Sequence, residues 1–224
     1  MRWPRAYRSV ALVGIDGSGK STQAELLRRL IAGQAAKRVF SVHPFGRKLL
    51  RVGVRSPILP SRTAGELPKK SPGILSRLVV VADVMDIALY LWLVHARAAF
   101  VALLGGKEVW LVGDRSMDDV LIKHWSRGTL SKRTAILIRS LVPHFGTTVW
   151  LEIEPRVAMG RDGDFELAYY EELYAAYSTA ARWFGWRVVR QDSRDRQAVH
   201  ESIVKELAPF RSSSDVQDIF GRRP

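Results

Sequence analysis

The chain has 224 residues, of which 47% are hydrophobic and 25% charged, values typical of one soluble globular domain with a substantial core. It has no cysteine, which excludes disulfides, thiolate metal sites and cysteine nucleophiles. Its formal net charge of +13 favours anionic partners such as phosphates, nucleic acid or anionic membranes, although a solvated arginine-rich surface would give the same excess.

The first half of the chain alternates short apolar runs with a helical pattern. Apolar runs predict buried strands at 9–13 and 38–42, and apolar residues at helical spacing predict a helix at 20–31. Residues 43–73 are rich in proline, glycine and basic side chains, which predicts a loop or a loosely helical insertion. The apolar run at 10–13 is too short for a secretory signal, so we expect a cytoplasmic protein.

A long apolar segment at 74–104 ends at a pair of glycines and predicts one long helix or two in succession. His95 and Arg97 lie within it, where a lipid-spanning helix avoids charge, so we expect a buried helix. Ten basic residues and a single acidic one lie within 37–77, and such a field attracts phosphates, nucleic acid or a membrane.

The second half continues the alternation. The pattern predicts strands at 108–113, 147–153 and 186–190 and helices at 117–126, 131–141, 165–184 and 196–207. Strands that alternate with helices indicate an α/β fold of three layers, in which a five-stranded parallel sheet is flanked by helices. We therefore expect one domain over 1–208, followed by a polar, mobile tail at 209–224.

The first predicted strand runs directly into a glycine-rich loop. Gly14, Gly19, Lys20 and Ser21 match G-x-x-x-x-G-K-[ST], the P-loop pattern. Its glycines let backbone N–H groups converge on phosphate oxygens, Lys20 would reach the β- and γ-phosphates, and Ser21 would ligate Mg²⁺. The motif therefore predicts an ATP site with Mg²⁺. The residues expected to bind ATP are Gly14, Asp16, Gly17, Ser18, Gly19, Lys20, Ser21 and Thr22.

Two polar residues follow the strand at 108–113. Asp114 stands where a second acidic group meets the Mg²⁺ shell of a P-loop sheet, and Arg115 could face the acceptor or the transferred phosphate. The alternative is a structural pair that caps the strand end. We favour the functional interpretation, because the carboxyl ends of strands form the ligand crevice in such sheets.

Several motifs together resemble the thymidylate kinase family. The chain lacks asparagine, which argues against a Ras-like GTPase, because that class needs an Asn-Lys-x-Asp motif. The segments 14–23, 114–115 and 151–155 resemble the family, and the order of elements agrees from about 10 to 207. The resemblance implies a P-loop kinase fold and phosphoryl transfer from ATP to a nucleoside monophosphate, with dTMP to dTDP as the best single expectation.

The resemblance also implies roles for individual residues. Family members carry an arginine inside the P-loop or supply it from a lid, and position 17 is glycine here, so Arg161 in a short lid at 156–166 inherits that role. The alternative for Arg161 is an exposed loop arginine. The expected catalytic residues are then Lys20, Asp114, Arg115 and Arg161, with Ser21 and Asp114 on the metal. The expected acceptor-binding residues are Asp16, on a sugar hydroxyl, together with Asp83 and Arg115.

Departures from the family pattern cluster at the acceptor side. The segment 42–46 lacks the family's arginine, and the phenylalanine and arginine of the long helix are replaced by Val80 and Val84. The region that the family fills with small hydroxyl residues and Tyr-Gln contains Asp119, Val120, Lys123 and His124. Candidates to replace the lost phosphate contact are Arg47, Lys48 and Arg51.

The sequence leaves three functions open. The leading one is a nucleoside monophosphate kinase that binds ATP and a small phosphorylated acceptor, with a homodimer as an option. The second keeps the kinase and changes the acceptor to a nucleoside, sugar or other metabolite. The third is a nucleotide-gated binding protein that uses the basic segment 37–77 on nucleic acid or a membrane.

Overall fold

The structure, a computed structural model, describes residues 4, 6–34, 37–42, 74–105, 107–191 and 195–207. Within the helix that begins at Ile74, the side chains of 74–80 and of Asp83 are not described. The expected basic insertion at 43–73 and the expected tail at 209–224 therefore lie outside the described residues.

The described strands form one parallel sheet in the order β2-β3-β1-β4-β5, which confirms the predicted fold class. The strands are β1 (Tyr7–Val13), β2 (Lys37–Val42), β3 (Glu108–Asp114), β4 (Thr147–Glu152) and β5 (Arg187–Arg190). β1 lies at the centre, where Val10 pairs with Val112 of β3 and with Thr147 of β4. Strands buried on both faces are near-continuous apolar runs, and this is why the sequence located them.

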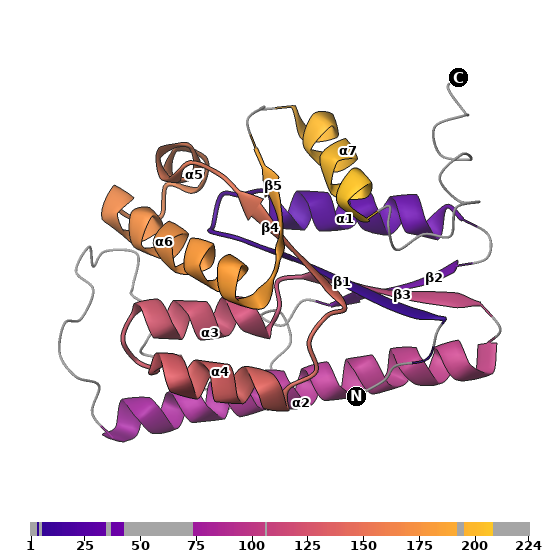
Figure 1. Cartoon of the computed structure of the whole chain (residues 1–224), viewed down its shortest axis with the longest axis horizontal. Helices are drawn as coiled ribbons and strands as arrows, with labels where there is room; N and C mark the ends of the chain where they lie inside the picture. Colours follow the sequence, from indigo (N-terminus) through magenta and orange to yellow (C-terminus); the bar gives the residue numbers. More distant parts are fainter. Residues whose placement is uncertain are drawn as a thin grey trace.

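Helices cover both faces of the sheet, so the molecule has three layers. The helices are α1 (Lys20–Ala32), α2 (Ile74–Gly105), α3 (Met117–Ser126), α4 (Lys132–Leu141), α5 (Pro155–Asp162), α6 (Leu167–Phe184) and α7 (Arg196–Leu207). Because successive strand residues point to opposite faces, Val10 and Leu12 pack with α1 and α7, whereas Ala11 packs with α2 and α3. Figure 1 shows α1 and α7 above the sheet and α2, α3 and α4 below it.

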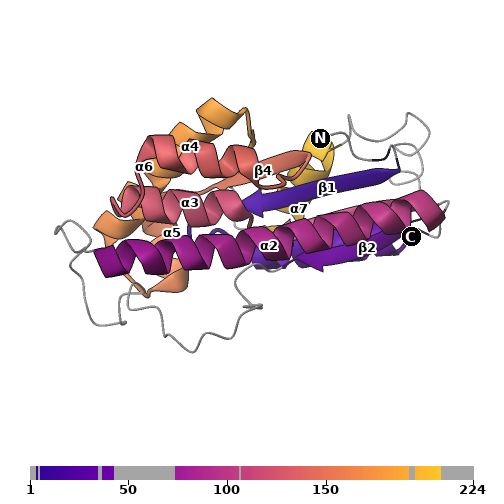
Figure 2. The ribbon, with the colours of Figure 1, turned by 90° about the horizontal axis from the view of Figure 1, so that it is seen from below.

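α2 is one continuous helix of 32 residues that runs across the underside of the sheet (Figure 2). The expectation of a buried helix is only half right, because one face packs inward and the other is exposed. Residues 84–105 are long and apolar enough to cross a membrane by length and composition, with a mean hydropathy of 1.9, and 28% of an 18-residue stretch within them is buried. On the inner face His95 is fully buried and its Nδ1 lies 2.9 Å from the Tyr7 hydroxyl.

The segment expected to be a lid folds differently from a loop. Residues 155–162 form α5, with Pro155 in the first turn and Gly163 in the left-handed conformation as its C-cap. Proline suits the first turn because its missing N–H is not needed there. Only four residues then separate α5 from α6, so most of the expected lid at 156–166 is helical.

Candidate active site

The P-loop connects the centre of the sheet to α1. α1 begins at Lys20 with Gly19 as its N-cap, and neither a capping side chain nor an acidic residue occupies its first turn. The first backbone N–H groups of a helix have no partner within the helix, and with the helix dipole they form a site for an anion. Ser21 and Thr22 are exposed in this turn. The geometry therefore suits a phosphate group at the start of α1.

Lys20 lies folded back over the loop. Its side chain is 4% exposed, and its Nζ donates to the carbonyl oxygen of Ile15 at 2.7 Å and lies 3.8 Å from Oδ1 of Asp16. Burial, together with the nearby positive charge of Arg115, lowers the pKa of Lys20 to about 8, although Asp16 opposes this shift. A phosphate anion at the loop would supply a stronger partner than the backbone carbonyl.

Gly17 lies where α5 approaches the P-loop most closely. Its φ of 82° falls in the left-handed region, and a Cβ built at this position would lie 2.4 Å from the carbonyl oxygen of Ala158. Since even a methyl group would collide with backbone, an arginine at position 17 would not fit without movement of α5. This contact gives a physical reason for the glycine in the loop.

Asp114 and Arg115 lie at the carboxyl end of β3, beside the P-loop. Asp114 is 6% exposed, and the backbone N–H of Arg115 donates to the carbonyl oxygen of Leu12 in β1. Arg115 has a φ of 82°, unusual for a residue with a side chain, and such strained residues cluster at functional sites. The turn directs its guanidinium to Asp16, at 2.8 Å.

The Asp16 carboxylate is the centre of a cationic cluster. Oδ1 accepts from Arg115 and Oδ2 accepts from Nζ of Lys123 on α3, each at 2.8 Å. Burial would raise the pKa of Asp16, but the charges of Lys123, Lys20 and Arg115 outweigh it and hold the pKa well below its usual range. The carboxylate is therefore ionised at neutral pH.

A second network supports the turn that carries Arg115. Oδ2 of Asp119 accepts from the backbone N–H of Ser116 at 2.7 Å, which completes a capping box at the start of α3. Oδ1 of Asp119 accepts from the hydroxyl of Tyr177 on α6 at 2.6 Å, and both side chains are fully buried. The network joins α6 to the residue that follows Arg115.

Arg161 lies on α5 and is linked to the P-loop through one intervening side chain, that of Gln191. It is exposed, and its Nη1 donates to Oε1 of Gln191, just after β5, at 3.1 Å. The amide nitrogen of Gln191 in turn donates to the carbonyl oxygen of Ser18. Arg161 is thus near the expected phosphate site, connected to the loop through Gln191.

The expected magnesium ligands fit the ion by their chemistry. Ser21 and Asp114 offer a hydroxyl and a carboxylate, the hard oxygen donors that Mg²⁺ prefers. The part of the chain that the structure describes contains no cluster of three or more His, Cys, Asp or Glu residues that could hold a metal.

One expected site residue lies beyond the described side chains. The structure places Asp83 on α2 but does not describe its side chain, and the candidate phosphate contacts Arg47, Lys48 and Arg51 lie outside the described residues. Val84, where the family pattern has arginine, is 3% exposed and packs in the core below the sheet.

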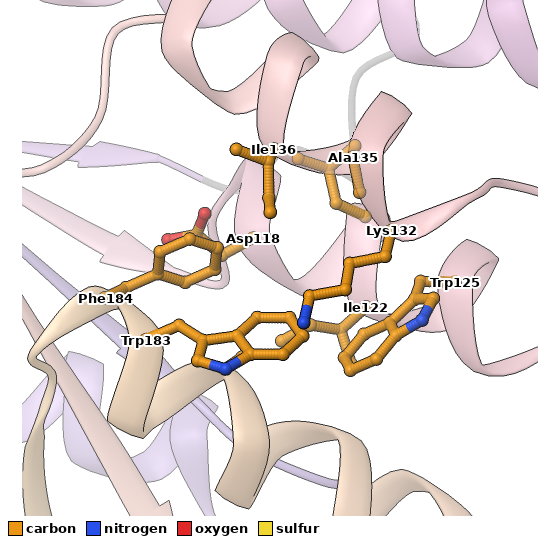
Figure 3. Close-up of a pocket in the computed structure, with 10 residues that line it drawn as sticks. Asp118, Ile122, Trp125, Lys132, Ala135, Ile136, Trp183 and Phe184 are labelled. Carbon is orange, nitrogen blue, oxygen red and sulfur yellow. The ribbon is translucent and has the colours of Figure 1, made fainter.

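A hollow between α3, α4 and α6 is separate from the P-loop (Figure 3). Trp125 and Trp183 border it with ring centroids 5.3 Å apart, and Nζ of Lys132 lies 3.3 Å from the centre of the Trp183 ring. That spacing leaves no room for another ring between the two indoles. The hollow is a seam between packed helices, in which these two tryptophans have a packing role.

Sequence reasoning missed three members of the site. It named Lys123 and Asp119 as departures from the family pattern without giving them roles, and it did not consider Tyr177. Lys123 and Asp119 are four residues apart, a spacing that puts them on one helix face and could have indicated a shared role. Tyr177 carries no comparable signal, because it lies 58 residues from its partner Asp119.

The fold matches that of a solved kinase structure. The crystal structure of thymidylate kinase from Ehrlichia chaffeensis aligns with a TM-score of 0.58 and 15% identity, covering 90% of this chain and 98% of that chain. No protein-family model matches the sequence, and a search of curated proteins finds no match. At this identity the similarity shows the fold alone, so the chain has the P-loop kinase-like fold of that thymidylate kinase.

Proposed function

We propose that this protein is an ATP-dependent kinase that transfers a phosphoryl group to a nucleoside monophosphate, with dTMP as the best single candidate. The observation that carries the proposal is the P-loop, whose uncapped helix start and buried Lys20 lie beside the charged cluster around Asp16. The similarity in fold to a thymidylate kinase supports the same class of reaction.

In the proposed reaction each half of the site has its own task. The N–H groups at the start of α1 and the Lys20 ammonium bind and orient the ATP phosphates, and Arg115 stabilises the negative charge on the transferred group. Arg161 would add a second cation after leaving Gln191. Ser21 and Asp114 would hold Mg²⁺, which neutralises charge on the phosphate oxygens when bound.

A coupled assay across nucleoside monophosphates tests the proposal. Production of ADP should require one of dTMP, dCMP, dGMP, dAMP or UMP, and the Lys20→Met variant should lose it. No ADP with any of these acceptors, while an ATP analogue still binds, would contradict the nucleotide acceptor but not the donor site.

The second candidate keeps the donor site and changes the acceptor to a nucleoside, sugar or other metabolite. The burial of Val84 favours it, because α2 offers no cation at the position where the family pattern has arginine. A thermal-shift screen of unphosphorylated metabolites, with AMP-PNP and Mg²⁺ present, would favour this candidate if a non-nucleotide alone stabilised the protein.

We also propose that the outer face of α2 pairs two copies of the chain. The exposed apolar side chains on it are Val81, Met85, Leu89, Trp92, Leu93, Phe100, Leu103 and Leu104. A large apolar side chain has roughly 150–250 Å² of surface, and about half of that surface is exposed in these eight residues, so this face offers on the order of 800 Å², one partner's share of a standard interface.

Charge on this face also favours a protein partner. Among the α2 residues whose exposure is described, Arg97 is the one charged side chain in the exposed class, and it lies over the Phe40 ring. Cores of protein interfaces are depleted of charge in this way. Light scattering should show a dimer that Leu93→Glu converts to a monomer, whereas Val188→Glu, on the exposed part of β5, should leave it dimeric. A monomeric wild-type protein that floats with anionic vesicles would contradict the pairing.

A further inference from the structure

Lys123 has no assigned role in the proposed reaction, yet it makes one of the shortest contacts of the site. Its Nζ donates to Oδ2 of Asp16 at 2.8 Å, while Arg115 already occupies Oδ1 at the same distance. Lys20 adds a third cation, 3.8 Å from Oδ1. Three positive side chains therefore surround one carboxylate of the P-loop.

The position of Lys123 on α3 directs it into the site. Asp119 and Lys123 are four residues apart and share a face of the helix, the face that also meets Tyr177 of α6. The Lys123 side chain is 17% exposed, and that of Arg115 is 27% exposed. Both cations are thus mostly buried but partly exposed, so a small ligand could still reach them.

The neighbouring carboxylate of Asp119 is engaged in other contacts. Both of its oxygens accept hydrogen bonds, one from Tyr177 and one from the N–H of Ser116, and these bonds hold the turn that carries Arg115. When Lys20 turns to the ATP phosphates, Arg115 and Lys123 remain on the two oxygens of Asp16, and the charge of Asp119 also acts on both of them. A buried lysine is costly unless an anion accompanies it, and an acceptor phosphate could replace Asp16 as the anion that accompanies Lys123.

We propose that Lys123 is an acceptor-binding residue that recognises the phosphate of a phosphomonoester. The inference rests on the kinase function proposed above. It specifies that the acceptor carries an anionic phosphate, and that the side chain that binds this phosphate lies on α3 and not on α2, where the family pattern has arginine. Lysine suits this task because its charge sits at the end of a flexible four-carbon stem.

The contact with Asp16 explains how Lys123 has an anionic partner both before and after the acceptor binds. Without acceptor, the Lys123 ammonium is neutralised by Asp16. With acceptor, the ammonium moves to the phosphate, and the released Oδ2 of Asp16 accepts a hydrogen bond from a hydroxyl of the same molecule. Lys123 exchanges one anion for another, and Arg115 stays on Oδ1 of Asp16, so neither Lys123 nor Asp16 is left as a lone buried charge.

Binding to the protein loaded with AMP-PNP and Mg²⁺ tests the proposal by titration calorimetry. The probes are dTMP and ribose 5-phosphate, each compared with its unphosphorylated counterpart, thymidine or ribose. Lys123→Met should weaken at least one phosphomonoester by about tenfold or more, the range for a hydrogen bond to a charged group, and should change the counterparts less than twofold. Lys123→Arg should restore most of the affinity.

The control variant is Lys132→Met, which removes the same charge from the surface of α4 and should leave phosphomonoester binding unchanged. Lys123→Gln provides a second variant if Lys123→Met folds poorly by circular dichroism. Three outcomes would overturn the proposal. Lys123→Met could lower the affinity equally for phosphorylated and unphosphorylated probes, it could leave both affinities unchanged, or the wild-type protein could bind neither phosphomonoester. Lys123-dependent binding of ribose 5-phosphate without turnover of any nucleoside monophosphate would support it while contradicting the nucleotide acceptor.

Discussion

The proposed donor and acceptor halves of the site are built in different ways. The proposed donor half is continuous in sequence, since one loop and the start of one helix would present backbone N–H groups and Lys20 to a phosphate. The acceptor half brings together Asp16 from the loop, Arg115 from a strand end and Lys123 from α3, with Tyr177 of α6 behind them. The comparison shows that a backbone-based site is visible as a motif, whereas a side-chain site can change its chemistry while the fold is kept.

The largest expected effect is on the donor half. Lys20→Met should lower kcat/KM by about 10²- to 10³-fold, because it removes a preorganised positive charge from the phosphate site. The free energy of unfolding should not fall, since the variant also removes a buried charge. Steady-state kinetics and urea unfolding measure the two effects, with Lys107→Met as the exposed control. An unchanged kcat/KM would show that Lys20 does not act in the donor site.

Gly17→Ala tests the contact between the P-loop and α5. The added methyl group meets the carbonyl of Ala158 at a positive φ, so we expect the free energy of unfolding to fall by about 2–3 kcal/mol. Gly160→Ala in α5 meets no atom within 4 Å and should be neutral or stabilising. Equal urea midpoints for the two variants would show that α5 does not press on the loop.

Tyr177→Phe tests the support of the acceptor half. It leaves one oxygen of buried Asp119 without its hydroxyl donor, which should cost about 1–2 kcal/mol of unfolding free energy. It should also raise the acceptor KM more than the ATP KM, because the Arg115 turn rests on Asp119. Tyr174→Phe, on the same helix, removes a bond to Glu152 and is the matched control. If the substitution raised only the ATP KM, Tyr177 would support the donor half and the assignment to the acceptor half would be wrong.

The pH dependence of nucleotide binding tests the donor half without substitution. We expect ATP to bind the charged form of Lys20, whose pKa is about 8, so the affinity for ATP should fall by up to about tenfold per pH unit above pH 8. The unfolded chain, with an ordinary value of 10.5, binds more protons between pH 8 and 10.5. The Lys20 contribution to unfolding free energy should therefore rise with pH over that window. Calorimetry from pH 7 to 9.5 measures the affinity, and a flat profile would contradict the assignment.

Several parts of the structure could be predicted closely, and others could not. The helices at 117–126 and 196–207 agree with the prediction to the residue, because their patterns end at clear breaks. The helical form of α5 was missed, since the segment was assigned to a mobile lid and no helix was predicted there. The exposed face of α2 was also missed, because an almost wholly apolar helix carries no period that separates its inner from its outer side.

The sequence by itself determined the order of the strands and of the described helices other than α5, together with the P-loop and the polar pair at the end of β3. Those features depend on local patterns: apolar runs, glycines at fixed spacing and helix breaks. Only the tertiary structure decided that Lys123 and Arg115 share one carboxylate, that Tyr177 supports them and that Gly17 touches α5. The physical reason is that these contacts join residues far apart in the chain, and side-chain charges and close approaches take effect only once packing has brought them together.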